Sequence, residues 1–258
     1  MGILKLKYTQ KDYEGYLEHF ITQGQFHKFN SSVLELGDIS KEGEYFEALA
    51  AFFDLEGFTS FCNQIDPHLV VPEYLSEFLN WLFTSISKET TMGKERNEIV
   101  LWCPLPFFAK FVGDGVLFLW DKRSLSPKDI GNIVLALGNI CDEYRETFLS
   151  SIKNKFTKPP SVLRCGIARG QIISIGDGRD FVGSCINVAA RLQKVGQFSF
   201  AFSKRGFNLT THFEKSAADY FTLIKMPIRG IGEEELIYVR KSDFDALTDK
   251  ERADLATL

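Results

Sequence analysis

One stretch decides the fold predicted for this chain, Phe52-Phe53-Asp54-Leu55-Glu56-Gly57-Phe58-Thr59, together with its later counterpart Lys110-Phe111-Val112-Gly113-Asp114-Gly115-Val116. In both, an apolar strand-like run ends in an aspartate close to a glycine, a pattern typical of a strand that enters a tight turn. We expect such a position to expose the carboxylate to a divalent ion and not to bury it. Asp54 and Asp114 are therefore candidate metal ligands.

A third stretch is Asp180-Phe181-Val182-Gly183-Ser184-Cys185-Ile186-Asn187-Val188-Ala189-Ala190-Arg191-Leu192. It predicts a glycine turn that opens an amphipathic helix, with Asn187 and Arg191 four residues apart and therefore on one face. Taken singly, each stretch also fits a plain helix start, a hairpin turn or a capped helix. Taken together, two carboxylates and an Asn/Arg face favour nucleotidyl transfer.

In this order the three stretches resemble the class III nucleotidyl cyclases, the adenylyl and guanylyl cyclase catalytic domain, over about residues 46–240. The resemblance implies an α+β fold, a ferredoxin-like palm with a mostly antiparallel sheet covered by helices. It implies a catalytic domain at residues 46–242, preceded by an N-terminal extension (1–45) and followed by a C-terminal tail (243–258).

Hydrophobic periodicity and turn residues predict the elements between these motifs. The expected helices span residues 10–23, 72–88, 127–154 and 184–195. The expected strands are 45–53, the pair 107–111 and 116–120, the pair 162–168 and 171–175 hinged at Gly170, then 198–203 and 236–240.

Composition limits the possible functions. The 258 residues are 45% apolar, enough for a full core, and the net charge of -4 argues against nucleic acid as a partner. No apolar run is long enough to span a bilayer and no signal peptide is evident, so we expect a cytoplasmic protein without membrane contact. Five scattered cysteines predict reduced thiols, and neither a zinc site nor a disulfide framework.

The resemblance also implies roles for individual residues. Asp54, Asp114 and the Leu55 carbonyl would hold two Mg²⁺ or Mn²⁺ ions per site, which suits hard oxygen ligands. Asn187 would orient the ribose, and Arg191 would stabilise the transition state. Because the family combines the metal aspartates of one protomer with the Asn/Arg helix of the other, it implies a homodimer with shared active sites.

The terminal phosphates of a nucleoside triphosphate need their own ligands. The backbone amides at a helix start suit them, and these belong to Glu56, Gly57, Phe58 and Thr59. Many family members add a lysine near the C-terminus, but here Ile231 stands at the best-aligned position. Arg229 or Lys225 would replace it. The alternative is that both lie on the solvated side of a strand.

The base is predicted less sharply. Lys110 and Asp180 align with the pair that adenylyl cyclases use to read adenine, which disfavours guanine. One donor and one acceptor also match cytosine or uracil, so the pair alone leaves all three bases open. Bulky rings at Phe52, Phe53, Phe108 and Phe111 would make the pocket shallow, unless they are ordinary core residues.

The stretch 53–62 and the later Cys165-Gly166-Ile167-Ala168-Arg169-Gly170 are similar to the cyclases of bacterial Pycsar antiphage systems. That resemblance implies conversion of UTP or CTP to cyclic UMP or cyclic CMP, an alarm signal that activates a separate effector. Two alternatives stay open. One is an adenylyl cyclase that makes cyclic AMP from ATP, and the other is a catalytically silent domain that binds nucleotide.

Overall fold

The computed structural model describes residues 4–13, 16–196, 198–253 and 255–257. The chain divides into two compact units, one of Met1–Tyr45 with Ile173–Val182 and the other of Phe46–Ile172 with Gly183–Leu258. None of the helices in these described ranges is long and apolar enough to cross a membrane. The cysteines are unpaired, as predicted, and four of the five are buried.

The first unit begins with a β-hairpin where the sequence predicts a helix over 10–23. Strands β1 (Thr9–Tyr13) and β2 (Tyr16–Phe20) pair antiparallel, and the tip between them lies outside the described residues. The helical prediction is wrong here because tyrosine, threonine and phenylalanine favour strands when alternation suits them. A single helical turn, α1 (Gln23–Phe26), follows, and β9 (Asp180–Val182) pairs antiparallel with Ile173–Ile175.

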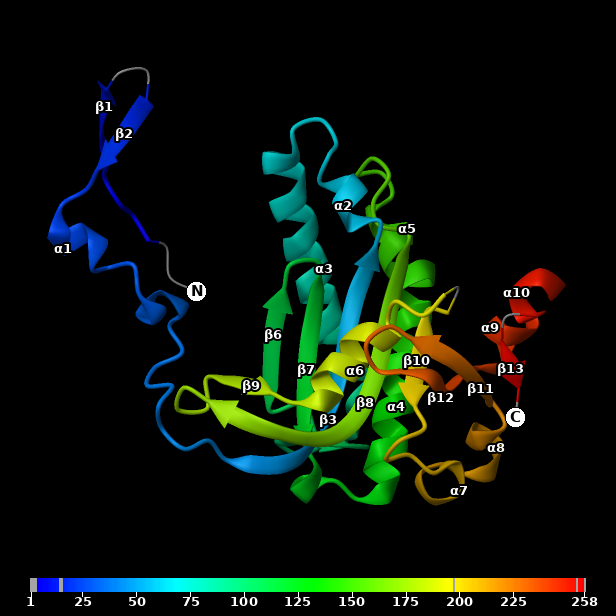
Figure 1. The fold of residues 1–258 in the computed structure, drawn as a ribbon. Helices are drawn as coiled ribbons and strands as arrows, with labels where there is room; N and C mark the ends of the chain where they lie inside the picture. The colour runs from blue at the N-terminus through cyan, green and yellow to red at the C-terminus, as the bar shows by residue number, and fades with distance from the viewer. Residues whose placement is uncertain (1–3, 14–15, 197, 254, 258) are drawn as a thin grey trace. The chain divides into compact units, whose positions relative to one another are not determined.

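The second unit is built on a mostly antiparallel sheet, as predicted (Figure 1). Its strand order is β13-β11-β12-β10-β8-β3-β7-β6, and β8 and β10 pair in parallel. The bounds of its strands are β3 Tyr45–Glu56, β6 Phe108–Val112, β7 Gly115–Asp121, β8 Val162–Ile175, β10 Phe200–Ser203, β11 Phe221–Ile228, β12 Gly232–Arg240 and β13 Ala256–Thr257. A separate hairpin joins β4 (Thr91–Glu95) to β5 (Glu98–Leu101).

Helices cover both faces of this sheet. The longest are α3 (Pro67–Thr90) and α4 (Pro127–Glu143), and α6 (Ser184–Leu192) crosses in front of β8 in Figure 1. The remaining helices are short: α2 Phe58–Phe61, α5 Leu149–Ile152, α7 Leu209–His212, α8 Lys215–Ala218, α9 Lys241–Asp245 and α10 Asp249–Ala253.

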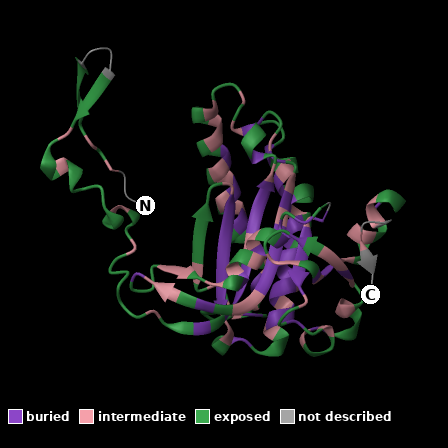
Figure 2. Cartoon of the chain, in the orientation of Figure 1, coloured by how far each residue is buried: buried purple, intermediate pink, exposed green. Residues whose placement is uncertain are grey.

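Alternation along the central strands divides the two faces. In β3 the odd-numbered residues Leu49, Ala51, Phe53 and Leu55 join the main core with α3 and α4. The even-numbered residues, including Asp54, therefore face the other side, which α6 covers. Figure 2 shows that the central strands are buried, whereas β6 at the sheet edge is exposed.

Two other expectations need correction. Residues 162–175 form one continuous strand, β8, instead of a pair hinged at Gly170. Glycine serves close packing there, because a Cβ at Gly170 would lie 3.2 Å from the Cβ of Cys185 in α6. The helix predicted at 72–88 begins earlier, at Pro67, and tolerates Pro72 within its second turn.

Helix α6 touches the sheet backbone to backbone. A Cβ on Gly166 of β8 would lie 2.2 Å from the Ala189 carbonyl oxygen and 2.5 Å from the Gln193 nitrogen. Such contacts are far too short for any side chain, so glycine at this position sets how deeply α6 sits on β8.

We predict that Gly166→Ala lifts α6 from the sheet and lowers the free energy of unfolding by about 1 to 3 kcal/mol, because overpacked backbone contacts must be relieved. Chemical denaturation measures the change. Gly93→Ala is the matched control, since nothing lies within 4 Å of its added Cβ. Equal stability of the two variants would contradict this packing.

Candidate active site

The two aspartates meet where β3 ends and β7 begins. Asp54 pairs in register with Gly115, and the Leu55 amide donates to the Asp114 carbonyl at 3.3 Å. Gly115 permits this approach, because a Cβ there would lie 2.3 Å from the Phe53 carbonyl oxygen. The structure thus brings the two predicted metal ligands together at one strand end.

Asp54 is buried, with 7% of its surface exposed, contrary to the expectation that the strand end exposes it. Burial, and next the nearby charge of Asp114, raise its pKa from 3.8 to about 6. Lys194 and Arg164 act in the opposite direction, but they do not offset the increase. Asp54 is therefore poorly solvated and also repelled by the charge of Asp114, which favours a cation beside the two carboxylates.

The donors present fit a divalent ion that also binds a polyphosphate. Within the described part of the chain, no group of three or more His, Cys, Asp or Glu residues could enclose a metal. Asp54, Asp114 and a main-chain oxygen would leave several coordination positions for phosphate oxygens and water. That is how Mg²⁺ is usually held in phosphoryl-transfer sites.

The predicted phosphate-binding amides lie in the turn after β3. Gly57, in the left-handed region with φ +85°, caps α2, which is a single turn from Phe58 to Phe61. The side chain of Glu56 is engaged in an ion pair with Arg164 at 2.5 Å. These amides follow Asp54 closely in sequence. Their role in phosphate binding stays a prediction.

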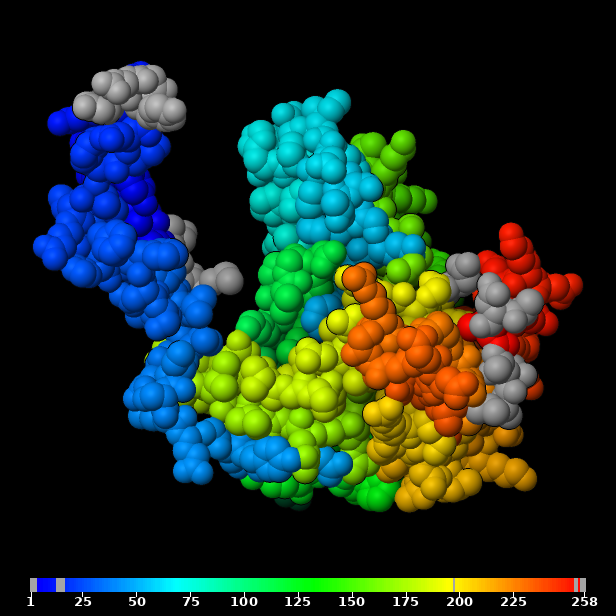
Figure 3. Space-filling model, viewed as in Figure 1, coloured from blue at the N-terminus to red at the C-terminus, as the bar shows by residue number. Residues whose placement is uncertain are grey.

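Asn187 and Arg191 lie four residues apart on α6, as predicted, and both are exposed. Arg191 lines a cavity of about 370 Å³ together with Lys194 and Arg229. Arg229 lies in the β11–β12 turn, which reaches the surface beside α6 in Figure 3. Of the two cations proposed to replace the family's lysine, Arg229 fits better, because Lys225 is paired with Glu234 at 2.7 Å.

Lys110 shares a row of the sheet with Phe52, the first phenylalanine of the decisive stretch. It pairs with Leu117, which pairs with Phe52, so the three side chains lie on the Asp54 face. Phe53 and Phe111 pair with Val116 in the next row and face the other side, where Phe53 is fully buried in the core. They therefore do not lie on the Asp54 face, and for Phe53 the alternative of an ordinary core residue holds.

Asp180 belongs to the other compact unit. It pairs with Ile175 at the start of β9, and its carboxylate accepts a hydrogen bond from the Phe181 amide at 2.9 Å. Its action together with Lys110 on one base stays a prediction.

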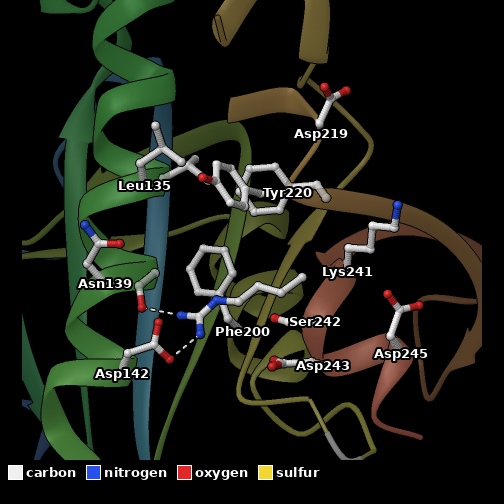
Figure 4. A pocket seen from close by; sticks show the side chains of 14 residues that line it. Leu135, Asn139, Asp142, Phe200, Asp219, Tyr220, Lys241, Ser242, Asp243 and Asp245 are labelled. Carbon is white, nitrogen blue, oxygen red and sulfur yellow. Dashed lines mark hydrogen bonds and ion pairs between the residues drawn. The ribbon is translucent and has the colours of Figure 1, made fainter. Parts of the chain in front are cut away.

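A larger cavity, of about 750 Å³, opens on the α4 side of the sheet (Figure 4). Its one deeply placed cation, Arg240, is bonded to Asp142 and to the Gly138 carbonyl, and it stacks 5.2 Å from the Phe200 ring centroid. This arrangement ties β12 to α4. Because the charge is neutralised and the cavity lies on the face opposite Asp54, we assign the chemistry to the aspartate end.

Sequence reasoning missed two cations that act on Asp54, namely Arg164 and Lys194. Lys194 could have been found by helical spacing, since it follows Arg191 by three residues. Arg164 could have been found by alternation in β8, where it shares a face with Gly166.

No protein-family model and no curated protein matches the sequence. Solved structures do match the fold. A guanylyl cyclase crystal structure has a TM-score of 0.56 at 17% identity, over 78% of this chain and 94% of that one. A bacterial light-regulated adenylyl cyclase has a TM-score of 0.51 at 18% identity, over 80% of this chain and 54% of that one.

A third match is the catalytic core of a rhodopsin-guanylyl cyclase with converted specificity, in complex with ATPαS. Its TM-score is 0.51 at 16% identity, over 78% of this chain and 98% of that one. The chain has the class III nucleotidyl cyclase fold. Because the matches include both adenylyl and guanylyl cyclases, the shared fold does not select a base.

We predict that Asp54→Asn stabilises the protein in a chelating buffer. A pKa raised on folding favours the native state below pH 3.8, and this contribution is lost as the pH rises through about 6. At pH 8 the variant should therefore be more stable, by up to about 3 kcal/mol, and the difference should vanish near pH 4.

Denaturant titrations between pH 4 and pH 8 measure this difference. Asp121→Asn serves as the opposite-sign control, because a hydrogen bond from Arg123 holds the pKa of Asp121 below its ordinary value. That control should lose stability at pH 8. A wild-type protein as stable as Asp54→Asn at pH 8 would overturn the electrostatic account of Asp54.

Proposed function

We propose that this protein is a nucleotidyl cyclase that converts a pyrimidine nucleoside triphosphate, UTP or CTP, to its 3′,5′-cyclic monophosphate and pyrophosphate. The observation that carries the activity is the Asp54/Asp114 pair at one strand end, where burial of Asp54, and next the charge of Asp114, raise the pKa of Asp54 to about 6. The cyclase fold and the exposed Asn187 and Arg191 on α6 support it. A catalytically silent domain would not need two carboxylates that repel each other.

Two Mg²⁺ or Mn²⁺ ions, held by Asp54, Asp114 and the Leu55 carbonyl, would supply Lewis-acid activation of the 3′-hydroxyl and neutralise the phosphates. The protein's own residues orient the reaction. Asn187 positions the ribose, and the planar fork of Arg191 binds two oxygens of the phosphoryl group under attack. The turn amides from Glu56 to Thr59 and the Arg229 side chain hold the terminal phosphates.

The preference for a pyrimidine rests on the space beside Lys110. The half-buried Phe52 ring shares its row of the sheet, so a purine's second ring would have to displace packed side chains. Lys110 would donate to the base and Asp180 would accept from it. The resemblance to Pycsar cyclases supports a product that acts as an antiphage signal on a separate effector in the cytoplasm. The Lys/Asp pair equally fits adenine, so ATP is the competing substrate.

The first test is incubation of the purified chain with Mn²⁺ and each of the four ribonucleoside triphosphates, followed by mass spectrometry. UTP or CTP should be cyclised about tenfold to hundredfold faster than ATP, which matches the cost of overpacking. Asp54→Ala and Asp114→Ala should each lose at least about a hundredfold in rate while remaining folded. Efficient conversion of ATP with UTP and CTP untouched would restore the adenylyl cyclase assignment.

A second test concerns assembly as a homodimer with shared sites. Asp54→Ala and Arg191→Ala proteins are each expected to be inactive, but one of the two sites in a mixed dimer would keep every essential group. Mixing them should therefore recover part of the wild-type rate. Mixtures that stay inactive, although subunit exchange is shown by a labelled protomer, would count against a site shared between protomers.

A further inference from the structure

The cavity beside α6 has an unusual lining. Three of its residues are the cations Arg191, Lys194 and Arg229, and the others are apolar or glycine: Val195, Gly196, Met226, Pro227 and Ile228. No carboxylate lines it. Across the residues that the structure describes, none of the three cations forms an ion pair or a side-chain hydrogen bond.

Three acidic residues on the neighbouring strands pair with other bases. Glu56 pairs with Arg164 at 2.5 Å. Glu234 pairs with Lys225 at 2.7 Å, and Glu235 pairs with Arg205 at 2.5 Å. The three cations thus line one cavity without an ion-pair partner among the described residues, although Lys194 also acts on the charge of Asp54, and such a cluster favours a multiply charged anion.

Backbone geometry keeps this cluster in place. Gly230, in the left-handed region with φ +74°, leaves room for Arg191, because a Cβ there would lie 3.3 Å from its Nη2 atom. Lys194 follows α6 in a tight turn, where its amide donates to the Arg191 carbonyl at 3.0 Å. The side chains of Arg191 and Lys194 therefore start from a fixed helix end, and Arg229 approaches from the β11–β12 turn.

We propose that Lys194 is a phosphate-binding residue that holds, together with Arg191 and Arg229, the linear polyphosphate of the substrate and the pyrophosphate product. The inference rests on the proposed function. It also accounts for Ile231, since a lysine in the turn after α6 takes over the charge that the β11–β12 turn lacks at that position. Three cations without ion-pair partners in the described part of the chain line a cavity of about 370 Å³, which suits a compact polyanion better than a single carboxylate.

A different role for Lys194 would be to complement the dipole at the C-terminal end of α6. That role predicts a change in stability and leaves anion affinity unaltered. The two roles are separated by measuring the binding of a plain polyanion.

The experiment is calorimetric titration of the full chain with inorganic pyrophosphate and with tripolyphosphate. Lys194→Gln should weaken binding about tenfold or more, because a charge-assisted hydrogen bond is lost. Lys194→Arg, which keeps the charge, should stay near wild type. Lys153→Gln is the matched control, since Lys153 is an exposed lysine at the end of α5 that lines none of these cavities.

The salt dependence gives a second readout, because Lys194→Gln should flatten the fall of pyrophosphate affinity with ionic strength. Affinity and salt slope equal to those of wild type would overturn the inference. The cyclase assay separates it from the proposed function. Selective loss of pyrophosphate binding in Lys194→Gln, with no triphosphate cyclised by wild type, supports the anion site and refutes the cyclase. If wild type cyclises a triphosphate but Lys194→Gln has an unchanged KM and unchanged inhibition by pyrophosphate, the cyclase is supported and the role of Lys194 is refuted.

Discussion

The approach of β7 to β3 at Gly115 is the constraint on which the site depends. Because no Cβ fits between Gly115 and the Phe53 carbonyl, the two strands close tightly and bring the turn with Asp114 against the end of β3. Repulsion between Asp54 and Asp114 opposes this closure. It is outweighed by the core face of the same strand, where Phe53 and Leu55 are almost fully buried, and burying two such side chains contributes about 3 to 6 kcal/mol.

A second close backbone contact at a glycine positions the cationic residues of α6. On β8, which neighbours β3 in the sheet, Gly166 lets the backbone of α6 rest against the strand. The even-numbered residues of both strands face α6, so Asp54 and Arg164 lie on the side that carries Arg191 and Lys194. Strand alternation, together with the close backbone contacts at Gly115 and Gly166, thus brings carboxylates and cations to one face. The opposite face holds the hydrophobic core.

The sequence predicted those parts of the fold that depend on local patterns. Strand ends at Asp54 and Asp114, the helix with Asn187 and Arg191, and the long helices all follow from periodicity and turn residues. Gly170 was misread as a hinge because a glycine needed for close helix packing looks the same in sequence as one needed for a turn. The burial of Asp54 was missed for a related reason, since it depends on tertiary packing and not on the local stretch.

Separation of charge explains why the two halves of the site do not neutralise each other. Glu56 and Arg164 form an ion pair next to Asp54, so neither is left to pair with the aspartates or with the cation cluster. Lys194 influences the pKa of Asp54 yet forms no ion pair within the described residues. The protein consequently keeps two carboxylates together and three cations together, and like charges repel within each group. Under the proposed function, a metal-bound triphosphate would carry both missing charges, so its binding would relieve both repulsions and stabilise the native state through linkage. The repulsion within each group would then contribute to the affinity proposed for a ligand that has both charges.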